Sequence, residues 1–170
     1  MKNSKRHLDD GISMDTQQIG IIGKHILIAN LIAADLEVAE PIRDHGIDLI
    51  AFRDRVESGE FLACPIQLKT ATDEVFGLDS KYENFSGLRI VFVWNARNPV
   101  NAEIFVLSYE EASIVLSEMK YDKTKSWEDG KYTTTRPSEK LKKILKEKFQ
   151  VTDPKEWPRR LGMKIPSAIP

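Results

Sequence analysis

Three polar side chains that could do chemistry interrupt two otherwise apolar segments. Asp48 lies in the run Ile-Asp-Leu-Ile-Ala-Phe, and Gln67 and Lys69 lie in the later run Pro-Ile-Gln-Leu-Lys. If the second run is a strand, Gln67 and Lys69 point to the same face, because side chains alternate along a strand. Packing alone does not readily explain an acid, an amide and a lysine in such apolar segments. These residue types favour a site for a metal ion and a phosphate.

These groups match the requirements of phosphodiester hydrolysis. The reaction needs an activated water, a hard cation and a positive group near the developing charge. Magnesium takes oxygen ligands and keeps several waters, so a few protein oxygens are enough to hold it. We therefore expect Asp48, Gln67 and the main-chain carbonyl of Leu68 to hold Mg²⁺ or Mn²⁺. Lys69 would assist the attacking water or neutralise the phosphate.

The elements that must position these groups follow from periodicity and capping signals. Antiparallel strands over 47–52 and 61–70 would place facing Cβ atoms about 5 Å apart, which brings Asp48 near Gln67 if the register allows it. Pro65 predicts a bulge, or a pairing that begins only after it. Residues 72–85 and 121–136 are expected to be loops. Other expected strands are 36–41, 88–94 and 103–107, and the expected helices are 15–34, one that follows Ser108, and 137–149.

Length and composition indicate one ordinary globular domain. The chain has 170 residues, 30% of them charged, and a formal net charge of −1, so any basic surface must be local. We expect a flexible N-terminus (1–12), a single α/β domain (13–150) and a tail packed on the surface (151–170). The domain would have a mixed sheet of about five strands flanked by helices, with an extra C-terminal helix.

Several classes of protein are disfavoured. The one cysteine, Cys64, cannot form a disulfide within the chain, and its apolar context favours a core residue over a nucleophile. No run is long enough to span a membrane and no signal peptide is evident, so a cytoplasmic protein is expected. The glycine-rich phosphate loops are missing as well, so we expect no organic cofactor.

An acid on the second strand followed by Gln-x-Lys on the third resembles the PD-(D/E)XK phosphodiesterase superfamily. The resemblance covers residues 15–107 and is closer to the branches of the Holliday-junction resolvases and restriction endonucleases. It implies a restriction-endonuclease-like core of the order α-β-β-β-α-β, in which Asp48, Gln67 and Lys69 occupy the signature positions. It also implies a magnesium-dependent endonuclease that acts on DNA, with a homodimer as a possible assembly.

The chain departs from that pattern at three positions. Ile47 replaces the proline, Gln67 replaces the second acid, and a Lys-His step follows Gly23 where many members have glutamate. His25 is therefore a candidate for a replacement ligand or proton carrier, and metal affinity should be weaker. Two functions stay open: a metal-dependent nuclease, and a catalytically eroded nuclease fold that binds nucleic acid or protein.

The predicted C-terminal helix offers a second basic feature. Five lysines stand against two glutamates in it. Such a face can follow a phosphate backbone, or it can simply be the solvated side of an amphipathic helix. The residues are Lys140, Lys142, Lys143, Lys146, Lys148, Glu139 and Glu147.

Overall fold

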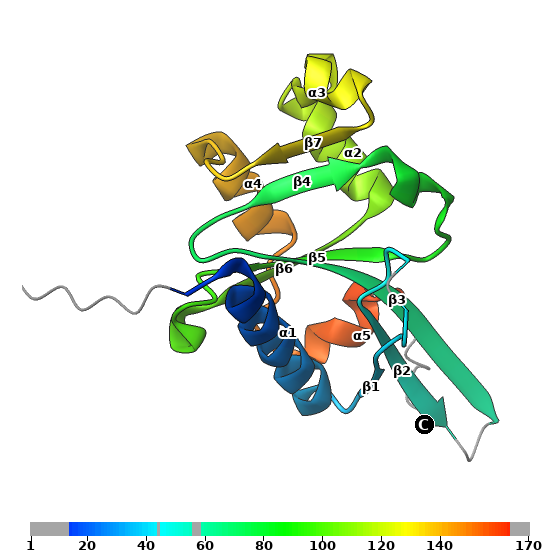
Figure 1. Cartoon of the computed structure of the whole chain (residues 1–170). Coiled ribbons are helices and arrows are strands. Elements are labelled where there is room, and N and C mark those ends of the chain that lie inside the picture. The colour runs from blue at the N-terminus through cyan, green and yellow to red at the C-terminus, as the bar shows by residue number, and fades with distance from the viewer. Residues whose placement is uncertain (1–13, 44, 56–58, 164–170) are drawn as a thin grey trace, which may run out of the picture.

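A five-stranded mixed sheet forms the centre of the protein (Figure 1). The structure, a computed structural model, describes residues 14–43, 45–55 and 59–163, so the expected flexible N-terminus lies outside it. The strand order is β1-β2-β3-β5-β6, with β3 and β5 parallel and the other neighbours antiparallel. The strands are β1 (Glu37–Ala39), β2 (Leu49–Arg55), β3 (Glu60–Thr70), β5 (Arg89–Trp94) and β6 (Glu103–Ser108).

Helices cover both faces of this sheet, which confirms the expected α/β class. α1 (Thr16–Ala33) and α5 (Trp157–Arg160) lie on one face, and α2 (Tyr109–Glu118) and α4 (Glu139–Lys148) lie on the other (Figure 1). Each face has its own hydrophobic core. In the part of the chain that the structure describes, no helix is long and apolar enough to cross a bilayer.

The β2–β3 hairpin has the register that the sequence left open. Leu49 pairs with Ile66, and the N–H of Asp48 donates to the carbonyl of Ile66 at 2.8 Å. Pro65 pairs with Ile50 without a bulge, whereas the pairing of β3 with β5 begins at Ile66. Pro65 therefore stands where β3 has a neighbour on one side only, a position in which its missing N–H costs little.

A second, two-stranded sheet was not expected from the sequence. β4 (Phe76–Asp79) pairs with β7 (Lys131–Thr134), and both segments were predicted to be loops. Each strand has only four residues, so the period-2 signal is short, but Phe76 stacks on Phe92 and is fully buried. The indole N–H of Trp94 donates to the carbonyl of Val75 at 2.6 Å, which ties this layer to β5.

The C-terminal segment packs differently from the expectation. Residues 151–163 do not simply lie on the surface, because α5 inserts side chains into the core beneath the sheet. Trp157 is fully buried, and Leu161 and Met163 join the same cluster as α1. The sequence does not predict this packing, because the tail contains four prolines. Its 3-10 and α-helical turns are also too short to show a helical period.

α1 approaches the sheet closely at one glycine. The helix begins at the predicted capping box of Asp15 and Gln18. At Gly23, a Cβ atom would lie 2.3 Å from both Cγ2 and Oγ1 of Thr70 on β3, whereas at Gly20 nothing lies within 4 Å of such an atom. Only glycine fits at position 23, and this contact sets the distance between α1 and the strand that carries Gln67 and Lys69.

We expect Gly23→Ala to destabilise the protein and Gly20→Ala to leave it as stable or more so. The added methyl at position 23 overpacks the α1–β3 contact, which costs about 2 kcal/mol. At position 20 the same change only raises helix propensity, by roughly 0.5–1 kcal/mol. Thermal unfolding of both variants measures the difference, and equal melting temperatures would contradict the packing argument.

Candidate functional site

Asp48 stands immediately before β2 and is held by β3. Its Oδ2 accepts a hydrogen bond from the main-chain N–H of Leu68 at 2.6 Å and one from Nε2 of Gln67 at 2.5 Å. The paired register places Asp48 opposite Gln67, one residue beyond Leu49 and Ile66. The carboxylate is therefore fixed by β3 rather than by its own strand, and two of the predicted site residues are in direct contact.

Gln67 turns its NH₂ group toward two oxygens. The same Nε2 atom lies 2.5 Å from Oδ2 of Asp48 and 3.2 Å from the carbonyl oxygen of Leu68. Its Oε1 accepts from the hydroxyl of Tyr82 at 2.8 Å, which fixes the orientation of the amide. In this arrangement Gln67 offers Asp48 a donor and not the ligand oxygen expected from the sequence.

Lys69 shares the face of Gln67, as the strand period predicted. Its Nζ lies 5.9 Å from the centre of the Tyr82 ring, the residue that also binds Gln67. Burial lowers the pKa of Lys69 from its ordinary value of 10.5, and the positive charge of Lys131 lowers that pKa further. The strand thus holds an ammonium group partly out of water, where its charge acts strongly on neighbouring groups.

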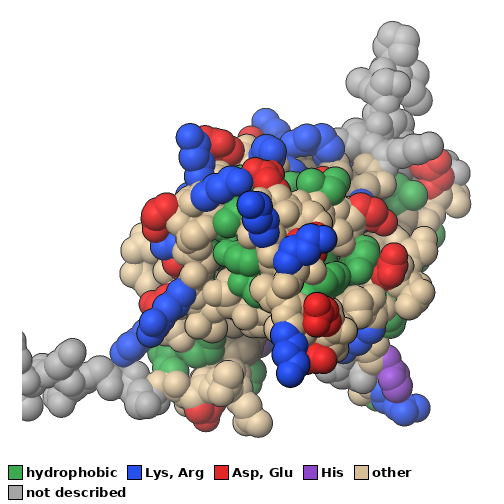
Figure 2. Space-filling view, turned by 90° about the horizontal axis from the view of Figure 1, so that it is seen from above, with side chains coloured by type: hydrophobic (Ala, Val, Ile, Leu, Met, Phe, Trp, Pro, Cys, Tyr) green, Lys and Arg blue, Asp and Glu red, His purple; other side chains and the backbone are tan. Residues whose placement is uncertain are grey.

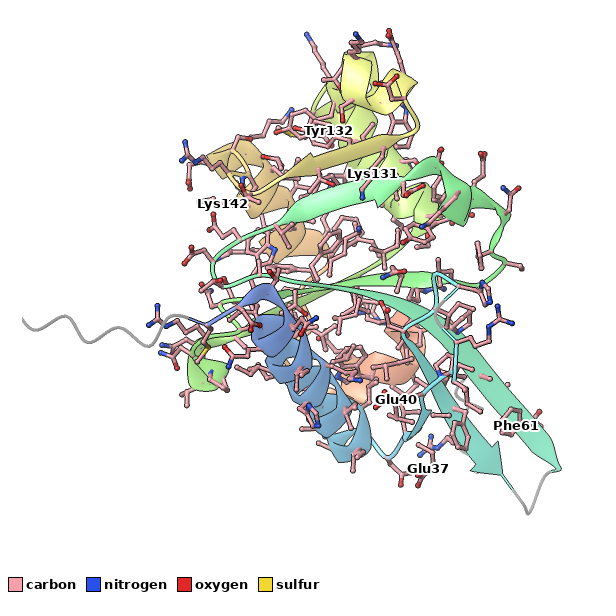
Figure 3. The ribbon with its side chains drawn as sticks, in the orientation of Figure 1. Glu37, Glu40, Phe61, Lys131, Tyr132 and Lys142 are labelled. Atoms are coloured by element: carbon pink, nitrogen blue, oxygen red, sulfur yellow. The ribbon has the colours of Figure 1, made fainter. Side chains whose placement is uncertain are left out.

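An open cleft of about 390 Å³ lies beside Asp48. One wall is α1, and the other is Asp48 with the end of β3. Lys24 lies in this wall of α1, and its Nζ forms an ion pair with Glu40 at 2.7 Å. Figure 3 labels Glu40, just beyond the end of β1. The lining residues are Gln17, Gly20, Ile21, Lys24, Asp48, Leu68 and Thr70.

The oxygen atoms of this site suit a hard divalent cation. Asp48 supplies a carboxylate, and Leu68 supplies a main-chain carbonyl. Both oxygens accept a hydrogen bond from the NH₂ group of Gln67. Such ligands fit Mg²⁺ or Mn²⁺, which keep several waters. In the described residues, no three or more His, Cys, Asp or Glu side chains gather in a way that could hold a metal. A site with one carboxylate is expected to bind weakly.

Two residues singled out from the sequence lie elsewhere. The structure does not bring His25 to this cluster: its Nδ1 contacts the carbonyl of Ile21 at 2.8 Å on its own helix, and its ring is exposed. Lys24, one position earlier, takes the place on the cleft because helix positions 17, 20, 21 and 24 share one face. Cys64 is buried, and burial raises the pKa of its thiol to about 11, as suits a core residue.

Tyr82 is a residue of the site that was not singled out from the sequence. It lies in the 3-10 helix η1 (Ser80–Asn84), inside a segment expected to be a loop, and is 5% exposed. Lys81 and Lys131 were not singled out from the sequence either. Their positions depend on the β4–β7 pairing, and no local spacing in the sequence encodes a contact between residues that far apart.

We expect Lys69→Met to stabilise the fold. The folded state lowers the pKa of Lys69, so the unfolded state binds more protons between that lowered pKa and 10.5, and wild-type stability rises with pH across this window. The gain in Lys69→Met is therefore largest below the lowered pKa, on the order of 1 kcal/mol or about 2–4 °C, and shrinks toward pH 10.5.

The control for this prediction is Lys81→Met, because the side chain of Lys81 is 58% exposed and carries an ion pair to Asp79. Melting temperatures of the three proteins from pH 7 upward provide the measurement. If Lys69→Met instead lost as much stability at neutral pH as Lys81→Met, the result would contradict the view that Lys69 is a charge kept for function.

Comparisons with protein-family models, with curated proteins and with solved structures found no match to this chain. The resemblance to the PD-(D/E)XK superfamily therefore depends on residue types and spacing, and it is carried forward as a proposal.

Proposed function

We propose that the protein is a metal-dependent endonuclease that hydrolyses phosphodiester bonds in DNA. The observation that carries the proposal is the contact of Asp48 with Gln67 and the main chain of Leu68, with Lys69 on the same face two residues on. A carboxylate bound to an amide and a main-chain N–H, with an ammonium group two residues farther along the same face of β3, serves no evident packing purpose. The carboxylate and the ammonium group are groups that phosphodiester hydrolysis requires.

The arrangement of elements supports a restriction-endonuclease-like core as part of this proposal. α1, β1, β2 and β3 follow one another as they do in the superfamily, and β5 lies parallel beside β3. One departure is the connection from β3 to β5, which carries β4 and the short helix η1 in place of an α-helix. That replacement is what brings Tyr82 to the site.

Asp48 and the Leu68 carbonyl would hold Mg²⁺ or Mn²⁺, and Gln67 would add its amide oxygen by exchanging its bond with Tyr82. When bound, the ion supplies positive charge to the scissile phosphate and lowers the pKa of a water. Hydrolysis forms a bond from water oxygen to phosphorus, breaks the bond from phosphorus to the leaving oxygen, and delivers a proton to that oxygen. Lys69 donates hydrogen bonds to the phosphate and orients the attacking water.

A second candidate is a nuclease fold that binds DNA without cutting it. Both ends of the Gln67 amide already have hydrogen-bond partners, which favours this candidate. Its NH₂ group donates to Asp48, and its oxygen accepts from Tyr82. With a single carboxylate at the site, these internal hydrogen bonds compete with a cation. Cleavage assays and metal titration separate the two functions.

Cleavage is expected with Mg²⁺ or Mn²⁺ on plasmid or branched DNA, and is expected to stop in a chelator. Asp48→Asn and Lys69→Met should each lower the rate at least ~100-fold, because each removes a group that stabilises the transition state. Lys143→Ala, on the exposed face of α4, is the control and should cleave like wild type. A wild-type protein that binds DNA but never cuts it would reject the nuclease and favour the second candidate.

Gln67→Glu is expected to make stability depend on metal. In a chelator, two adjacent carboxylates replace the Asp48–Gln67 bond, which lowers the free energy of unfolding by about 2 kcal/mol. Millimolar Mn²⁺ should restore the melting temperature, since an ion that binds the folded state stabilises it. Mn²⁺ affinity measured by calorimetry should rise roughly tenfold over wild type, as the second carboxylate adds ligand charge.

Gln67→Leu is the matched control for that experiment. It loses the same hydrogen bond and gains no ligand, so its melting temperature should fall without recovering in Mn²⁺. If Mn²⁺ shifts neither variant, the cluster around Asp48 is no metal site and the proposed mechanism is lost.

A further inference from the structure

Two lysines face the ring of Tyr82, and a third, from another element, acts on one of them through its charge. Lys69 of β3 and Lys81 of η1 place their Nζ atoms 5.9 and 5.0 Å from the centre of the Tyr82 ring. Lys131 of β7 pairs directly with Asp79, two residues before Lys81, and its charge acts on Lys69. Figure 3 shows Lys131 in the layer above the five-stranded sheet.

The second layer is built to hold this arrangement. Oδ1 of Asp79 accepts from the N–H of Lys81 at 3.0 Å and thereby starts η1. The N–H of Ser80 donates to the carbonyl of Gly130 at 2.8 Å, and Gly130 has a φ of +89°, which favours glycine. Backbone contacts therefore fix Lys81 and Lys131 relative to each other before any ligand is present.

These charges are compensated only in part. Lys81 has an ion pair with Asp79 at 3.7 Å, but among the described residues no carboxylate forms an ion pair with Lys69 or Lys131. Asp48 and Asp79 are the acids that act on Lys69, and they are outnumbered by the three lysines. Gathering like charges is unfavourable unless an anion joins them, so this cluster is matched to a negative ligand.

The basic helix α4 offers a contrast. Lys142 is paired with Glu74 at 2.7 Å and Lys146 with Glu103 at 2.8 Å, and Lys140 and Lys143 also have carboxylate partners. The lysines of α4 are therefore largely neutralised within the protein. In the described part of the chain, two of the three lysines at Tyr82 have no ion pair with a carboxylate, whereas four of the five lysines of α4 have one.

We propose that Lys69, Lys81 and Lys131 form a phosphate-binding site around Tyr82 that holds the backbone of a nucleic-acid strand. The inference rests on the proposed function for its ligand class and extends the site from the sheet into the β4–β7 layer. An ammonium group binds phosphate as a point charge, and the Tyr82 ring adds a cation–π contact to two of the three. Lys69 then belongs to both sites, because Gln67 and Leu68, the partners of Asp48, come directly before it on β3.

Figure 2 looks onto the β4–β7 layer from above and shows Lys and Arg side chains mixed with Asp and Glu side chains around an exposed hydrophobic area. Tyr121 stacks on Tyr132 with ring centres 4.3 Å apart, and both rings are half-buried. Because side chains alternate along a strand, Tyr132 and Lys131 lie on opposite faces of β7, so this aromatic pair is separate from the lysines around Tyr82.

The test measures binding of a labelled DNA duplex by fluorescence anisotropy, in a chelator so that no cleavage occurs. Affinity is recorded from 50 to 200 mM salt, and the slope of log K against log salt counts neutralised phosphates. Lys81→Ala and Lys131→Ala should each weaken binding several-fold and lower that slope by about 1. Lys131→Arg keeps the charge and should keep the slope.

Lys143→Ala is the matched control, because it removes the same charge from exposed α4 and should leave the slope unchanged. Loss of binding in Lys131→Ala supports the inference even if the wild-type protein never cleaves, which would reject the proposed function alone. Unchanged slopes in Lys81→Ala and Lys131→Ala, in a protein whose cleavage requires Asp48, would overturn the inference and leave the nuclease intact. A reduced slope in Lys143→Ala with none in Lys131→Ala would instead place the DNA on α4.

Discussion

The Asp48 carboxylate is the contact on which the rest of the site depends. It accepts the N–H of Leu68 and the NH₂ of Gln67, while its own N–H donates to the carbonyl of Ile66. These bonds fix the start of β2 against β3 in one register. A slip by one residue would move Gln67 and Lys69 to the face covered by α1. The same contact therefore sets the strand pairing and gathers the chemical groups.

The layer formed by β4, η1 and β7 adds Tyr82 to this contact. Tyr82 is buried and directs its hydroxyl at Gln67, so the orientation of the amide is decided by η1 and not by the hairpin. Its ring also faces two ammonium groups, one of which is partly withdrawn from water. Keeping Lys69 charged there opposes folding. Natural chains carry such residues where function requires them.

Local signals in the sequence were sufficient for most of the large sheet. The alternation around Gln67 and Lys69, the capping boxes at Asp15 and Ser108 and the apolar runs of β5 and β6 all depend on neighbours within a few residues. The convergence of Asp48 with Gln67 followed because a hairpin is the simplest pairing of adjacent strands. At Pro65 the sequence predicted a bulge or a pairing that begins only after it, and the second outcome is found for β5 but not for β2, which pairs with Pro65 without a bulge.

The remaining features depend on contacts that sequence spacing does not encode. Tyr82 reaches Gln67 only because β4 pairs with the distant β7, and Trp157 is buried because a proline-rich turn docks beneath the sheet. His25 was chosen for its chemistry, but helix geometry turns Lys24 and not His25 toward the cleft. The donor role of Gln67 depends on its partner, Tyr82, and could not be derived from the residue type.

The most direct measurement of the central claim is an anomalous-difference map from crystals of the protein soaked in Mn²⁺. The account predicts a peak in contact with the Asp48 carboxylate and the Leu68 carbonyl oxygen, with the Gln67 amide turned so that its oxygen, and not its NH₂ group, faces the ion. A map at saturating Mn²⁺ with no peak there, and with Gln67 still donating to Asp48, would contradict it.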